Sequence, residues 1–197
     1  MTTISRRELL AGATGTLFMP PLLAAGKSAG RLADDSVYQL RLALTDQSGA
    51  SFALDAHRGT PMIVSMFYTS CPYVCPMLVE TIQATERKLT PEERGRLRVL
   101  LVSFDPDTDT VEVLQKTAQA RRVDSTRWAL ARTDAAGVRK LAALLGIQYR
   151  AIGKADFNHS TLLVALDAEG RIAGKTGQLA GTDAAFINTL RRALSLA

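Results

Sequence analysis

Cysteine is scarce in this chain of 197 residues, which contains only Cys71 and Cys75. Two cysteines are too few for the disulfide framework of a small secreted scaffold. The two stand four positions apart, so a disulfide between them would close a very short loop and add little stability through chain entropy. The scarcity excludes a disulfide-stapled fold and leaves redox exchange or metal ligation as the roles of this pair.

Runs of basic residues are also missing, since no run of lysine and arginine exceeds two residues. The 24 basic and 19 acidic residues are scattered along the chain and leave a net charge of +5. Nucleic-acid-binding domains concentrate their positive charge on one face or helix, so we expect no nucleic-acid partner. With 47% apolar and 22% charged residues, the composition is that of a soluble globular protein.

A long uninterrupted apolar run is absent too. Within residues 1–30, Arg6 and Arg7 precede an apolar stretch that ends near Ala25 and is broken by glycine and proline. The stretch is shorter than the ~20 residues of a membrane helix, and the arginine pair resembles a twin-arginine export signal. We therefore expect export to the periplasm, with membrane contact only through this segment if it stays uncleaved as an anchor. Residues 31–36 are expected to be a linker to a domain at 37–197.

What is present is an alternation of strand and helix patterns along that domain. Nearly continuous apolar runs at 62–68 and 98–104 predict strands that are covered on both faces. The pattern predicts an α/β, thioredoxin-like fold, with a central mixed sheet flanked by helices and an N-terminal β-hairpin extension. The predicted strands are 38–44, 51–54, 62–68, 98–104, 160–167 and 171–175, and the predicted helices are 76–88, 110–122, 135–145 and one from 182 or 183.

Both cysteines fall where the strand at 62–68 gives way to a helix, the sheet edge at which α/β proteins build sites. The free N–H groups and partial positive charge of a helix N-terminus favour thiolates, so the pKa of each cysteine is expected to be depressed. Proline disfavours helical backbone in the residue before it, so Pro76 predicts that Cys75 lies at the helix cap. Two buried structural cysteines are the alternative, which the flanking prolines disfavour.

His159 is the third member of the predicted site. Dithiol oxidoreductases of this fold carry a cis-proline facing the cysteines, but the last proline here is Pro106, and His159 stands in the corresponding place. Two thiolates and one imidazole suit copper, Cu(I) first and Cu(II) second, whereas zinc prefers a fourth ligand that we do not find. The other histidine, His57, precedes the strand at 62–68 and is expected to be structural.

Acidic residues follow the strand at 98–104, in the segment Asp105-Pro-Asp-Thr-Asp-Thr110. Aspartate and threonine commonly form turns and helix caps, so Asp109 is expected to be the N-cap of the next helix. Asp105 is a candidate for a residue that does not bind the metal itself but orients the ligands or a partner protein.

Together these motifs resemble the Sco/SenC family over about residues 35–197. The resemblance implies a thioredoxin-like fold that binds copper through Cys71, Cys75 and His159. It also implies a metallochaperone for the copper A centre of cytochrome c oxidase, with the apo form of subunit II as partner and another copper chaperone or thiol reductant upstream. The matching segments are Tyr68-Thr-x-Cys-Pro-x-Val-Cys-Pro76, Asp105-Pro-x-x-Asp-Thr110, His159-Ser160, Leu44-Thr-Asp-Gln-x-Gly49, Arg58-Gly-x-Pro61 and Leu166-Asp-x-x-Gly-Arg171.

The chain departs from the family pattern at Thr60, Tyr73 and Thr108, where lysine, aspartate and arginine are usual. None of these is an expected ligand, but Tyr73 and Thr108 change the charge around the site and hence the expected partner surface. Two other functions remain open at this point. One is a thiol-disulfide oxidoreductase that reduces the cysteines of the copper-site apoprotein, and the other is a peroxidase with one activated cysteine.

Overall fold

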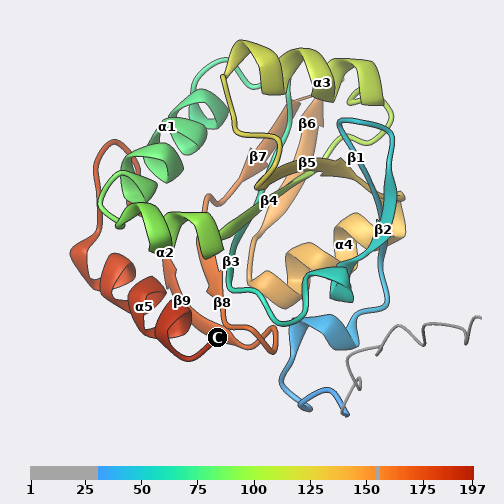
Figure 1. Ribbon diagram of the computed structural model, residues 1–197. Coiled ribbons are helices and arrows are strands. Elements are labelled where there is room, and N and C mark those ends of the chain that lie inside the picture. The colour runs from blue at the N-terminus through green and yellow to red at the C-terminus, as the bar shows by residue number, and fades with distance from the viewer. Residues whose placement is uncertain (1–30, 154–155) are drawn as a thin grey trace, which may run out of the picture. The chain divides into compact units, whose positions relative to one another are not determined.

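The structure is a computed structural model, and it describes residues 31–153 and 156–197 (Figure 1). The predicted export segment, residues 1–30, lies outside the described residues. Within the described part of the chain, no helix has both the length and the apolar character needed to cross a membrane.

Seven of the strands in the described residues form one mixed sheet, in the order β2-β1-β5-β4-β3-β8-β9. The three central strands run parallel, and antiparallel hairpins flank them on both sides. A second, two-stranded sheet is formed by the hairpin β6–β7. The strands are β1 (Ala43–Asp46), β2 (Ser51–Ala53), β3 (Met62–Phe67), β4 (Arg98–Ser103), β5 (Trp128–Arg132), β6 (Tyr149–Gly153), β7 (Asp156–His159), β8 (Leu163–Leu166) and β9 (Ile172–Thr176).

Helices cover both faces of the seven-stranded sheet (Figure 1). The crossovers through α1 and α3 run in the same direction across the sheet, so their right-handedness places both helices on one face. On β9, Gly174 faces Thr189 of α5 while the next residue, Lys175, bonds to the carbonyl of Leu145 in α4, which puts α5 and α4 on opposite faces. The helices are α1 (Val74–Glu86), α2 (Pro91–Arg96), α3 (Val111–Ala120), α4 (Ala135–Leu145) and α5 (Ala184–Ser195), with short 3₁₀ helices η1 (Val37–Gln39) and η2 (Leu54–His57).

The core lies on the central strands, as their apolar runs predict. All six residues of β3 are buried, and β4 is buried at every position after Arg98. Because β3 and β4 run parallel, their carboxyl ends, Phe67 and Ser103, meet at one edge of the sheet. The connections that leave this edge carry the cysteines and the Asp105–Thr110 segment.

The predicted α/β, thioredoxin-like fold is confirmed, and the N-terminal hairpin 43–53 joins the sheet through β5. The predicted strand 38–44 is wrong in its first half, because Ser36 caps the 3₁₀ helix η1 and extended pairing begins only at Ala43. The sequence did not predict α2, β5 or the hairpin β6–β7. Each of these strands and helices is short, and most residues of the hairpin are exposed, so none shows a strong hydrophobic period.

Gly170 fixes the turn between β8 and β9, and it provides a test of this packing. Its φ is +77°, and a Cβ there would lie 2.4 Å from Cδ2 of the buried Tyr38 ring. Gly170→Ala should lower the free energy of unfolding by roughly 2–4 kcal/mol, since left-handed backbone and overpacking each cost alanine on the order of 1–3 kcal/mol. Guanidinium titration followed by circular dichroism measures this.

The matched control is Gly95→Ala in α2, where an added Cβ would meet nothing within 4 Å. Alanine is the better helix former, so this variant should be unchanged or more stable by about 1 kcal/mol. An equal loss of stability in both variants would contradict the packing described for Gly170.

Candidate metal centre

The two cysteines lie at the junction of β3 and α1. The helix begins earlier than predicted, with Tyr73 as its N-cap and Val74 as its first residue. Cys75 is therefore the second helical residue and not the cap. Pro76 occupies the third helical position, where the missing N–H would have no acceptor within the helix, so the proline fits the first turn without breaking it.

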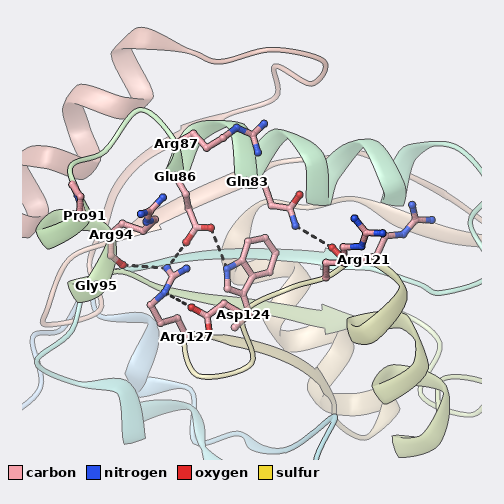
Figure 2. Close-up of a pocket in the computed structure, with 11 residues that line it drawn as sticks. Gln83, Glu86, Arg87, Pro91, Arg94, Gly95, Arg121, Asp124 and Arg127 are labelled. Atoms are coloured by element: carbon pink, nitrogen blue, oxygen red, sulfur yellow. Dashed lines mark hydrogen bonds and ion pairs between the residues drawn. The ribbon is translucent and has the colours of Figure 1, made fainter.

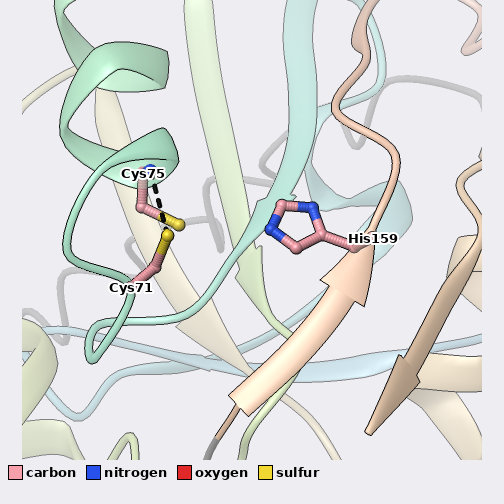
Figure 3. Close-up of side chains that lie close together, drawn as sticks. All are labelled: Cys71, Cys75 and His159. Atoms are coloured by element: carbon pink, nitrogen blue, oxygen red, sulfur yellow. Dashed lines mark hydrogen bonds between the residues drawn. The ribbon is translucent and has the colours of Figure 1, made fainter. Parts of the chain in front are cut away.

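The sulfur atoms are buried and held by backbone N–H groups. The Cys75 N–H donates to Cys71 Sγ over 3.4 Å, and the Tyr68 N–H donates to Cys75 Sγ over 3.4 Å. Both cysteines are free thiols, and Figure 3 shows the two sulfurs side by side. The strand end and the helix start thus each supply one donor that fixes a sulfur.

The two thiols differ in acidity. Burial opposes ionisation of Cys71, but the N–H groups of Cys75, Tyr73 and Val74 outweigh it and lower the pKa of Cys71. The pKa of Cys75 is raised well above its ordinary value, chiefly by burial and further by the nearby charges of Cys71 and Asp109. The expectation of a depressed pKa is thus right for Cys71 and wrong for Cys75, for which burial outweighs the hydrogen bond from the Tyr68 N–H.

His159 ends β7 and faces the cysteine pair from the far side of the site (Figure 3). Its Nδ1 lies 3.2 Å from the Ser160 carbonyl oxygen. A carbonyl only accepts, so Nδ1 carries the proton and Nε2 keeps its lone pair for a ligand. One donor atom from each of Cys71, Cys75 and His159 lies within 4.8 Å of the others.

These distances fit a metal ion. Metal–sulfur and metal–nitrogen bonds of about 2.0–2.3 Å place the donors of a three-coordinate ion roughly 4 Å apart, so small side-chain rotations close the remaining gap. The predicted trio is therefore brought together by the fold.

An aromatic cluster surrounds the imidazole. The His159 ring contacts Phe104 and Tyr68 at centroid distances of 5.0 and 5.7 Å, and Phe104 stacks on Tyr149 at 5.0 Å. Phe157 packs edge-on against Tyr68 at 5.1 Å. This apolar shell limits water around the donors and orients the ring, and none of its members was predicted as part of the site. Tyr68 and Phe104 directly follow β3 and β4 at the sheet edge that carries the cysteines. This position was the one feature of the sequence that could have indicated their part in the site.

Asp109 has a different role from the predicted one. Thr110 caps α3 by accepting from the Val113 N–H, while the Asp109 carboxylate is buried, with 1% of its surface exposed. It accepts from the Thr69 N–H at 3.1 Å, from the Thr69 hydroxyl and from the Ser103 hydroxyl. Burial raises the pKa of Asp109, and these three donors oppose that rise. The carboxylate ties the cysteine loop to the end of β4.

Asp105 and His57 lie outside the donor trio. Asp105 Oδ1 accepts from the Thr108 N–H at 3.4 Å, while Oδ2 is buried without a hydrogen bond within the described residues. Its part in orienting the site stays a prediction. His57 is half-buried and packs edge-on against Phe52, in agreement with a structural role.

A family profile described as SCO1/SenC matches residues 32–195. A protein of Stutzerimonas stutzeri described as "Putative copper-binding protein" is 29% identical over 75 residues, which cover 38% of this chain and 37% of that protein. The chain thus spans well under half the length of this relative.

Solved structures agree in fold. A "putative electron transfer protein" of Aquifex aeolicus VF5 has a TM-score of 0.69 and 26% identity, covering 78% of this chain and 89% of that one. ScoI of Bradyrhizobium japonicum with copper bound has a TM-score of 0.65 and 22% identity over 77% and 96%. BsSco, described as a member of the Sco family of cytochrome c oxidase assembly proteins with a disulfide switch, has a TM-score of 0.64 and 18% identity over 85% and 100%.

The unequal acidity of the thiols predicts selective alkylation. Cys71 and Cys75 are 7% and 5% exposed, so protonation and not access should decide, and iodoacetamide should modify Cys71 first at neutral pH. Because the pKa of Cys71 is lowered, its rate should reach half its maximum at a lower pH than in the unfolded chain. Peptide mass mapping of the metal-free, reduced protein measures this, with the denatured protein as control. Equal labelling of both cysteines in the folded protein would contradict the assignment.

The Asp109 contacts predict a large loss of stability on truncation. Asp109→Ala leaves the buried donors on Thr69 and Ser103 without an acceptor, which should cost on the order of 2–4 kcal/mol in free energy of unfolding. Denaturant titration measures the loss. The control is Asp107→Ala, an exposed aspartate in the same segment that should change stability by less than about 0.5 kcal/mol. A similar stability for the two variants would remove the role given to Asp109.

Proposed function

This chain belongs to the SCO1/SenC family, and we propose that it is a copper-binding protein whose cargo is held by Cys71, Cys75 and His159. The observation that carries the proposal is the convergence of two cysteine sulfurs and one imidazole nitrogen within 4.8 Å. Two soft sulfur donors and one imidazole favour Cu(I), and they also accommodate Cu(II). The copper bound in ScoI of Bradyrhizobium japonicum supports the same cargo here.

Within this proposal the protein is an assembly factor that passes copper to an apoprotein, with the copper A site of cytochrome c oxidase subunit II as target. The family resemblance and the description of BsSco support this target. Tyr73, which lies between the cysteines and is 79% exposed, would form part of the docking surface. Export by the arginine-containing segment, residues 1–30, would place the protein in the periplasm, where such a target is exposed.

A thiol-disulfide reductase is a second candidate, favoured by the unequal thiols. Cys71, with its lowered pKa, would attack a partner disulfide and form a mixed disulfide. Cys75 would then displace the partner thiol. This step leaves a Cys71–Cys75 disulfide and a reduced partner dithiol, and two electrons and two protons pass between the proteins. An oxidised pair cannot offer two thiolates to copper, so the two functions exclude each other at any one moment.

Copper titration tests the proposal directly. The reduced protein should bind one equivalent of Cu(I) in competition with bicinchoninate, and the oxidised protein should bind none. His159→Ala should weaken Cu(I) binding by at least about tenfold. Loss of a ligand should have a larger effect than loss of a residue that only hydrogen-bonds to a ligand, which typically costs about tenfold or more. His57→Ala is the matched control and should bind as the unmodified protein does, because His57 lies apart from the trio.

An unchanged Cu(I) affinity in His159→Ala would overturn the ligand assignment. Mixing the loaded protein with the reduced apo domain of subunit II separates the two functions. Metal transfer supports the copper donor. Reduction of the disulfide-bonded domain by His159→Ala, without copper, supports the reductase.

A further inference from the structure

A second concave site lies at the end of α1 that is remote from the cysteines (Figure 2). Its volume is about 630 Å³, and it is lined by the end of α1, by α2 and by the turn after α3. Cys75 and Glu86 lie near opposite ends of α1, so a rise of 1.5 Å per residue separates the cleft from the metal site by roughly 16 Å. The cleft is therefore not part of the donor trio.

Positive charge gathers in this cleft. Its two acidic residues, Glu86 and Asp124, both pair with Arg127, at 2.5 and 2.9 Å. The guanidinium groups of the other four arginines make no hydrogen bond or ion pair within the described residues. The C-terminal ends of α1 and α3 add about half a negative charge each, and the balance remains close to +2. The lining arginines are Arg87, Arg94, Arg121, Arg122 and Arg127.

The backbone that carries these arginines is fixed from within the cleft. Gln83 Nε2 donates to the Arg121 carbonyl at 3.1 Å, and Arg127 donates to the Arg94 carbonyl at 3.1 Å (Figure 2). On the floor, Trp128 Nε1 donates to Glu86 at 3.2 Å, and both residues are buried. The arginine head groups are thus free while the backbone that carries them is held in place, which limits the entropic cost of binding to the ordering of the side chains.

The cationic residues that line the cleft are all arginine. Arginine binds phosphate and carboxylate groups through two parallel hydrogen bonds, which lysine cannot do. Arg122 has a φ of +51°, a left-handed conformation for which glycine is favoured after a helix. Arginine therefore occupies a position at which glycine would adopt the backbone conformation with less strain. Arg94 and Arg121 lie at separate ends of the cleft, with Gln83 between them (Figure 2).

We propose that this cleft binds a small multivalent oxyanion, with phosphate or carboxylate groups at its two ends. One end would be held by Arg87 and Arg94 and the other by Arg121 and Arg122. The volume is that of a small-molecule site, and recognition requires neither copper nor the cysteines. The site is independent of the function proposed for the donor trio.

The single tryptophan of the chain, Trp128, reports on the cleft it lines. Titrating the full-length, metal-free protein with tripolyphosphate at constant ionic strength should give a saturable change in tryptophan fluorescence. Calorimetry should give a stoichiometry of one. The double variant Arg94→Gln/Arg122→Gln should bind at least tenfold more weakly, while its thermal unfolding and its Cu(I) affinity stay unchanged.

The matched control is Arg139→Gln/Lys140→Gln, which removes the same charge from exposed positions of α4 outside the cleft. It should bind tripolyphosphate as the unmodified protein does. Equal weakening in both double variants, or no saturation, would overturn the proposal in favour of non-specific screening. Tighter binding of a hexaglutamate peptide than of tripolyphosphate would overturn the small ligand in favour of a protein segment.

Discussion

The buried carboxylate of Asp109 is the interaction on which the geometry of the metal centre depends. The loop after β3 and the segment after β4 leave the same edge of the sheet, and neither is held there by strand pairing. Asp109, which belongs to the segment after β4, accepts from Thr69 in the loop after β3 and from Ser103 at the end of β4. Burying a carboxylate is costly unless its oxygens are satisfied, and here three donors satisfy them. The position of Cys71, two residues beyond Thr69, follows from this anchor.

The sequence predicts the fold and the donor trio because both depend on strong local signals. The apolar runs of β3 and β4 and the helix at 135–145 are found as predicted. The chemistry of two cysteines facing a histidine was equally readable. Each of these signals consists of a single residue type or of a local hydrophobic pattern. It can therefore be recognised without the tertiary structure.

The errors arise where burial decides. Asp109 and Thr110 are both good helix caps in sequence, and only the tertiary structure shows that the aspartate is enclosed by Thr69 and Ser103. The acidity of Cys75 was misjudged for the same reason, since burial raises its pKa by more than the Tyr68 N–H lowers it. The aromatic residues around His159 come from four separate segments, and no spacing in the sequence joins them.

The histidine reaches the site on the hairpin β6–β7, which forms its own sheet and leaves many of its residues exposed. The cysteines belong instead to the junction of β3, which is buried at every position, and its helix α1. Elements with few buried contacts open at lower free energy than a core does. The three donors therefore differ in how rigidly the fold holds them. The imidazole of His159 would dissociate from a bound ion before either cysteine sulfur does. Exchange with a competing donor would proceed through the imidazole side, while the domain as a whole stays folded.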